Sequence, residues 1–153
     1  MQLREMHRMP GHLIRRAQQI AVALFMEECA ELDLTPVQYA TLVAVSEHPG
    51  IDATRLSSLI AFDRSTLGNV LERLEARRLI HRYAAHEDKR VKLLRLTPAG
   101  AALIARAQAP VLRAQERILE PLKSADRERL IALLESLVEL NNDASRVPQR
   151  AAG

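Results

Sequence analysis

The chain has 153 residues, of which 22 are Lys or Arg and 19 are Asp or Glu, so its formal net charge is only +3. This length suits one domain, or one small domain with helical extensions, and it provides enough residues for a hydrophobic core. A single cysteine excludes a disulfide within the chain. No apolar run reaches the roughly 18 residues of a membrane span, and no secretory signal is readable. We therefore expect a cytoplasmic protein with no membrane partner.

The basic residues are concentrated in the middle of the chain. Residues 51–98 contain 10 basic and 6 acidic side chains, whereas residues 1–50 contain 4 and 6, and residues 99–153 contain 8 and 7. Most of the basic residues are arginine, which makes forked contacts with phosphates and guanine, although codon usage can produce the same bias. The middle third is the part whose charge favours nucleic acid.

The first half of the chain predicts four helices. Apolar residues recur at spacings of three and four over residues 8–32, which indicates a long amphipathic helix. Thr35, followed by a proline, begins a second helix that ends before Pro49. Asp52 and Asp63 are the capping residues of two shorter helices separated by a turn.

The pattern changes after these helices. Residues 79–83 and 91–96 are short and rich in β-branched or aromatic residues, and they flank a polar tip, which predicts a β-hairpin. Thr97 and the proline after it begin another long helix, and Ser124 is the expected cap of the last one. Residues after Asn142 are expected to be a frayed tail.

This order predicts a mainly α fold: a winged helix-turn-helix with a two-stranded β-hairpin wing and N- and C-terminal dimerisation helices. A short helix, a tight turn and a second helix form the helix-turn-helix, and the hairpin supplies the wing. The first and last helices have apolar stripes too large for one small winged domain to cover. A symmetric homodimer is the simplest way to bury them.

Polar side chains on the second helix and the hairpin tip are the candidates for contacting double-stranded DNA. Gly68 leaves room for close approach, and Asp88 can orient Arg90 through paired hydrogen bonds for insertion into the minor groove. The alternative interpretation is an ordinary polar helix surface and a solvated turn. The candidate DNA-binding residues are Arg64, Ser65, Thr66, Asn69, Arg73, Asp88, Lys89 and Arg90.

The stretches 63–66 and 74–80, together with Asp88-Lys89-Arg90 and the Leu-Arg-Leu-Thr-Pro-Ala-Gly run of 94–100, resemble the winged-helix signature of MarR-type transcriptional regulators. The resemblance covers nearly all of residues 10–142. It implies a homodimeric repressor on a pseudo-palindromic operator. By the resemblance, Ser65, Thr66, Asn69 and Arg73 match the recognition helix, and Asp88 and Arg90 match the wing. The implied division is an N-terminal dimerisation helix (1–34), a winged helix-turn-helix DNA-binding domain (35–98), and C-terminal dimerisation helices with a tail (99–153).

Members of this family often bind small aromatic acids between the dimer helices and the winged domain. The N-terminal half resembles the family's regulators of aromatic-acid and hydroxynicotinate catabolism, which implies a hydroxynicotinate- or benzoate-like effector that releases the repressor from DNA. Arginine with nearby histidine and amide donors suits a carboxylate on a flat ring, although Arg15 and Arg16 could equally face solvent or form intersubunit salt bridges. The candidate ligand-binding residues are His7, His12, Arg15, Arg16, Gln19, Gln38 and Tyr39.

Two alternative functions remain at this stage. A cysteine-based oxidation sensor would depend on Cys29, but the flanking acids Glu27, Glu28 and Glu31 raise a thiol pKa, so we expect a structural cysteine. A winged-helix protein-interaction module would bind no DNA. The chain has no histidine pair at helical spacing, no nucleophile elbow and no phosphate-binding glycine loop. We therefore expect no metal, no cofactor and no enzymatic activity.

Overall fold

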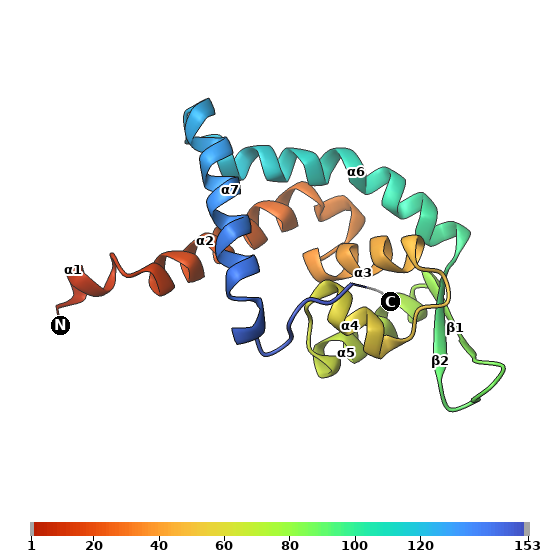
Figure 1. Cartoon of the computed structure of the whole chain (residues 1–153). Helices are drawn as coiled ribbons and strands as arrows, with labels where there is room; N and C mark the ends of the chain where they lie inside the picture. Colours follow the sequence, from red (N-terminus) through yellow and green to blue (C-terminus); the bar gives the residue numbers. More distant parts are fainter. Residues whose placement is uncertain (1, 152–153) are drawn as a thin grey trace.

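In the computed structural model, which describes residues 2–151, a two-stranded antiparallel hairpin accompanies a chain that is otherwise mainly helical (Figure 1). This confirms the predicted fold class and the order of its elements. Within this range no helix is long and apolar enough to span a bilayer. In chain order the elements, with η for a 3-10 helix, are α1 (Leu3–Met6), α2 (Pro10–Glu28), η1 (Ala30–Leu32), α3 (Pro36–Glu47), α4 (Ala53–Ile60), α5 (Arg64–Ala76), β1 (Ile80–Ala84), β2 (Lys92–Leu96), α6 (Pro98–Leu119), α7 (Ser124–Leu140) and η2 (Asn142–Ala144).

The predicted capping residues begin α3, α4 and α5. The Thr35 hydroxyl accepts a hydrogen bond from the Gln38 N–H at 3.3 Å, and the Gln38 side-chain oxygen accepts one from the Thr35 N–H at 3.0 Å. The Asp52 and Asp63 carboxylates each accept hydrogen bonds from backbone N–H groups in the first turns of α4 and α5. These bonds satisfy donors that a helix cannot pair internally, so the prediction of these caps is confirmed.

Three predictions about the ends of helices were wrong. The helix predicted over residues 8–32 is shorter, because α2 spans Pro10–Glu28 and Ala30–Leu32 form the separate 3-10 helix η1. Ser124 is the first residue of α7 rather than its cap, and Lys123 precedes it without a side-chain cap. The chain after Asn142 is also not frayed but packs back onto α4 through hydrogen bonds. Apolar periodicity marks a buried face and not the exact residue at which a helix ends.

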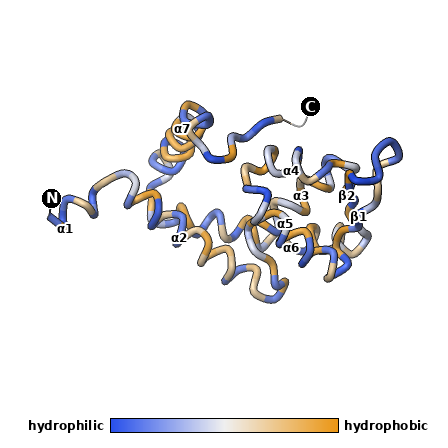
Figure 2. The backbone as a smooth tube through the Cα atoms, turned by 90° about the horizontal axis from the view of Figure 1, so that it is seen from below, coloured by the Kyte–Doolittle hydropathy of each residue, from blue (hydrophilic) through white to orange (hydrophobic). Residues whose placement is uncertain are grey.

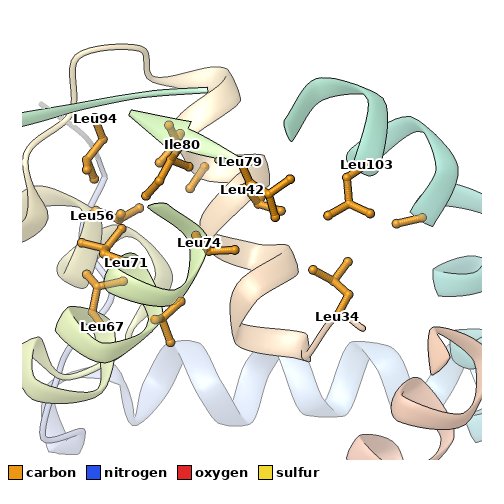
Figure 3. Close-up of a cluster of buried hydrophobic side chains, with 14 of the residues drawn as sticks. Leu34, Leu42, Leu56, Leu67, Leu71, Leu74, Leu79, Ile80, Leu94 and Leu103 are labelled. Atoms are coloured by element: carbon orange, nitrogen blue, oxygen red, sulfur yellow. The ribbon is translucent and has the colours of Figure 1, made fainter. Parts of the chain in front are cut away.

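The core lies where α3, α4, α5, the hairpin and α6 meet (Figure 3). Leu42 of α3, Leu56 of α4 and Leu94 of β2 are almost completely buried, as are Leu67 and Leu74 of α5. Burying one leucine side chain contributes roughly 1.5–3 kcal/mol. This shared core therefore fixes α4, α5 and the hairpin relative to one another.

The start of α6 packs so closely against the hairpin that its third residue has no room for a side chain. The Thr97 hydroxyl caps the helix by accepting a hydrogen bond from the Gly100 N–H at 3.0 Å. A Cβ on Gly100 would lie 2.6 Å from Cδ1 of Leu96 and would overlap the carbonyl oxygen of Leu79. A backbone oxygen cannot move aside as the end of a flexible side chain can, so this approach requires glycine.

We therefore expect Gly100→Ala to lower the free energy of unfolding by about 1–3 kcal/mol, the usual range for overpacking. The matched control is Gly11→Ala in α2, where an added Cβ would meet no atom within 4 Å. The control should leave stability unchanged or raise it by less than about 1 kcal/mol. Urea denaturation of both variants measures the difference, and equal stabilities would contradict the close packing.

Candidate nucleic-acid interface

The α4–α5 unit has the geometry of a helix-turn-helix. Ala61 ends α4 in the left-handed conformation, with φ of 54°, and the buried Ser57 hydroxyl donates a hydrogen bond to the Phe62 carbonyl at 2.6 Å. These two features fix the turn. Because the apolar face of α5 is buried in the core, its polar face is directed outward.

The predicted recognition residues lie on the first three turns of α5. Arg64 donates a hydrogen bond to the Thr54 hydroxyl of α4. The Thr66 hydroxyl donates to the Asp63 carboxylate at 2.7 Å, and this bond, with that from the Thr66 N–H, lowers the pKa of Asp63. The residues Ser65, Asn69 and Arg73 are exposed.

The tip of the wing orients an arginine as the sequence predicts. Arg90 donates from Nε and from a terminal nitrogen to the two carboxylate oxygens of Asp88, each at 3.0 Å. The side-chain bond from Arg90 lowers the pKa of Asp88. The Arg90 side chain is nevertheless 92% exposed, and the neighbouring Lys89 is exposed as well. The wing therefore presents two cations to solvent, one of them held in a fixed direction.

A hollow of about 620 Å³ separates α4 and α5 from the wing and has a strongly cationic rim. Its lining includes Gly68, whose missing side chain leaves open space. Arg82 is also there, with its Nε donating at 2.6 Å to the Glu75 carboxylate and lowering the pKa of that group. The cations that line the hollow are Arg55, Arg64, Arg82, Arg90 and Lys92.

Three of these cations, Arg55, Arg82 and Lys92, are absent from the residues proposed on sequence grounds. The available signal was the excess of basic residues over 51–98. To select individual residues from this excess, one must know which face of the hairpin lies against α5. The hairpin register, which pairs Arg82 with Leu94 and Ala84 with Lys92, supplies that information.

A second hollow, of about 510 Å³, lies between α2, the start of α3 and α5. Its lining is mainly apolar, and Arg73 is the one charged side chain in it. Gln38 is the only predicted ligand-binding residue that lines this space, but three predicted recognition residues line it too. The side chains that line this space include Val22, Met26, Gln38, Phe62, Thr66, Asn69 and Arg73.

The structure groups most of the other predicted ligand-binding residues on the N-terminal part of α2 and just before it. The His7 and His12 rings lie 4.9 Å apart, and Arg15 donates to the Gln19 side chain at 3.0 Å. Partial desolvation, followed by the charge of Arg15, lowers the pKa of His12. Arg16 is exposed nearby. Within one chain these groups lie outside the second hollow.

Tyr39 is the last of the predicted ligand-binding residues, and Cys29 is the residue on which an oxidation sensor would depend. Cys29 belongs to the hydrophobic core, and Tyr39 packs against it. Tyr39 of α3 packs against Phe25, with 6.1 Å between ring centres. Cys29 is 1% exposed, and burial, followed by the charge of Glu28, raises the pKa of its thiol. Both effects disfavour the reactive thiolate. Among residues 2–151, no three His, Cys, Asp or Glu side chains are grouped as metal ligands.

The core-anchored α4–α5 unit, its outward polar face and the cationic wing define a winged helix-turn-helix DNA-binding protein. The model of the MarR family matches residues 34–92. The transcriptional repressor NicR of Pseudomonas putida is 31% identical over 135 residues, which are 88% of this chain and 85% of NicR. The chain therefore belongs to the MarR family, as the resemblance implied, and is a transcriptional regulator and not an enzyme.

Solved structures agree with this assignment. Bordetella bronchiseptica BpsR, described with the regulation of its DNA binding by 6-hydroxynicotinic acid, superposes with a TM-score of 0.80 at 30% identity and covers 86% of this chain and 94% of its own. The transcriptional repressor CouR, bound to a 23-mer DNA duplex, gives 0.81 at 29% identity over 90% of this chain and 98% of its own.

We expect Arg90→Ala to weaken binding to operator DNA and to lower the slope of log affinity against log salt by about one. The control is Arg106→Ala, which removes an exposed arginine on α6 and changes the net charge equally. Fluorescence anisotropy over a salt series measures both quantities. Identical slopes for the two variants would contradict a DNA contact by the wing.

Proposed function

We propose that this chain is a homodimeric repressor that binds a pseudo-palindromic operator and is released by a small aromatic carboxylate. The observation that carries the proposal is that the exposed face of α5 and the wing border one cationic hollow. The DNA-binding residues predicted from the sequence lie on these two elements. A protein of this kind acts where chromosomal DNA is, which supports the cytoplasm as its location.

The apolar faces of the outer helices support the homodimer. No residue of α7 is buried, and Leu140 is 85% exposed. Leu13 and Ile14 of α2 are about half exposed. Apolar faces of this extent mark an interaction surface, and a second copy of the chain offers the same faces for mutual burial. We retain the division predicted from the sequence, with dimerisation helices in 1–34 and 99–153 and the DNA-binding domain in 35–98, as part of this proposal. The exposed apolar residues of α7 are Ile131, Leu133, Leu134, Leu137, Val138 and Leu140.

A dimer of this type requires an operator with two matching half-sites. Two recognition helices related by a two-fold axis meet successive major grooves when they are roughly 34 Å apart. Ser65 and Asn69, exposed on α5, then face the base edges, whereas the wing arginine approaches the minor groove.

The second hollow supports binding of an aromatic carboxylate. Its volume lies within the range of about 300–1,000 Å³ typical of small-molecule sites. Val22, Met26 and Phe62 provide apolar surface for a ring, and Arg73 provides a partner for a carboxylate. The solved relative BpsR supports the hydroxynicotinate class, since the regulation of its DNA binding is described with 6-hydroxynicotinic acid. Arg15, with the α2 groups around it, is the alternative carboxylate partner in a site completed by a second copy.

The position of the second hollow supports a direct mechanism of release. Thr66, Asn69 and Arg73 line it and also belong to the proposed DNA-reading face. A ligand seated against these side chains stabilises one placement of α5 relative to α2. It can shift DNA affinity only by binding the two placements differently.

The operator proposal is tested with the protein and the DNA upstream of its own gene. We expect a dimer in light scattering and a protected region of two half-sites in footprinting. Asn69→Ala should remove about 1–3 kcal/mol of the binding free energy that discriminates the base pair contacted by Asn69, as loss of a base contact does. The preference for that base pair should therefore relax. A monomer, or protection that ignores DNA sequence, would contradict the proposal.

The effector proposal is tested by titrating 6-hydroxynicotinic acid and benzoic acid into the DNA-free protein. Loss of a charge-assisted hydrogen bond costs about 1.5–3 kcal/mol, so Arg73→Ala should weaken binding at least about tenfold. Arg15→Ala is the comparison variant: a loss confined to it would place the carboxylate on α2 instead. If calorimetry detects no binding of either acid, an effector of this class is excluded.

A further inference from the structure

The last residues of the chain complete the end of α4. The Gln149 side-chain nitrogen donates a hydrogen bond to the Leu59 carbonyl at 3.0 Å, and the Arg150 N–H donates to the Ser58 carbonyl at 3.0 Å. These carbonyls belong to the last turn of α4, where a helix has no internal partners for its acceptors. In Figure 2 the chain after α7 runs toward the side of the domain where α4 lies. We call residues 142–150 the C-terminal loop.

Polar contacts also close the C-terminal loop on itself. The Gln149 N–H donates to the Asn142 side-chain oxygen at 2.8 Å, and the Asn142 side-chain nitrogen donates to the Gln149 carbonyl at 3.1 Å. Arg150 forms an ion pair with Asp143 at 3.2 Å. Because both ends of the loop are held, the residues between them have a defined position beside the DNA-binding domain.

Arg146 is exposed in this loop, and the loop is bonded to the last turn of α4, directly before the turn that leads into α5. Its positive charge contributes, after the hydrogen bonds from Thr66, to the lowered pKa of Asp63, the capping residue of α5. Arg146 forms no ion pair with the described residues. It is therefore available for an anion outside the chain.

We propose that the C-terminal loop is a third DNA-contacting element, in which Arg146 binds a backbone phosphate beside the major groove that α5 enters. The proposal rests on the operator binding proposed above. The cationic hollow covers the side of α5 that faces the wing, and Arg146 places a further cation at the N-terminal end of this helix. Two phosphate backbones border a major groove, so cations at both places hold the helix in register.

The test measures operator binding by Arg146→Ala in the full chain over a salt series. We expect affinity to fall about three- to tenfold and the salt slope to decrease by about one, the effect of losing one phosphate contact. The exposed Arg106→Ala variant changes the net charge equally and should leave both quantities unchanged. Binding to DNA of unrelated sequence should weaken by the same factor, since phosphates carry no sequence information.

A second variant separates a DNA contact from structural support. Gln149→Ala removes the bond to α4 and should weaken binding no more than Arg146→Ala does. If Arg146→Ala keeps wild-type affinity and slope, the proposed contact is overturned. A loss seen only in Gln149→Ala would mean that the loop merely supports α4, which overturns it too. Failure of the wild-type chain to bind any operator would instead refute the proposed function, and this inference with it.

Discussion

Burial of one face of α5 in the core is the constraint on which the reading surface depends. Leu67 and Leu74 are completely buried, and Leu71 is nearly so. With these side chains fixed, rotation of α5 about its axis would expose apolar surface at a cost of several kcal/mol. Every polar residue on the helix therefore has a determined direction. The site is a consequence of packing rather than of any bond among the polar residues themselves.

Carboxylates hold several of the polar side chains at the DNA-binding surface in position. The carboxylates of Asp63, Glu75 and Asp88 all lie beside the cationic surface, and each is engaged by hydrogen bonds that lower its pKa. They remain ionised and organise neighbouring donors. A small overall charge thus conceals a positive surface in which Glu75 orients Arg82 and Asp88 orients Arg90, while Asp63 caps α5.

Most local features of this structure could be predicted from the sequence, although Ser124 begins α7 instead of capping it, whereas the long-range contacts could not be predicted. Caps such as Asp52 and the Asp88–Arg90 pair involve residues two or three positions apart, so residue type and spacing are sufficient. The approach of Arg73 to the α2 side chains depends on how two helices cross. The bond from Gln149 to Leu59 joins residues 90 positions apart, and the segment around Gln149 carries no pattern that identifies its acceptor.

Gln38 has two uses that constrain how a regulator of this kind could be adapted as a biosensor. Its side-chain oxygen closes the capping box of α3, while the residue also lines the second hollow. Changing it to alter ligand preference would simultaneously weaken the start of a core helix, and the two effects would be hard to separate in a screen. Val22 and Met26 line the same hollow from a partly exposed helix and form no cap. For the effector site proposed in the second hollow, selectivity for a new ligand is therefore more accessible through α2 than through α3.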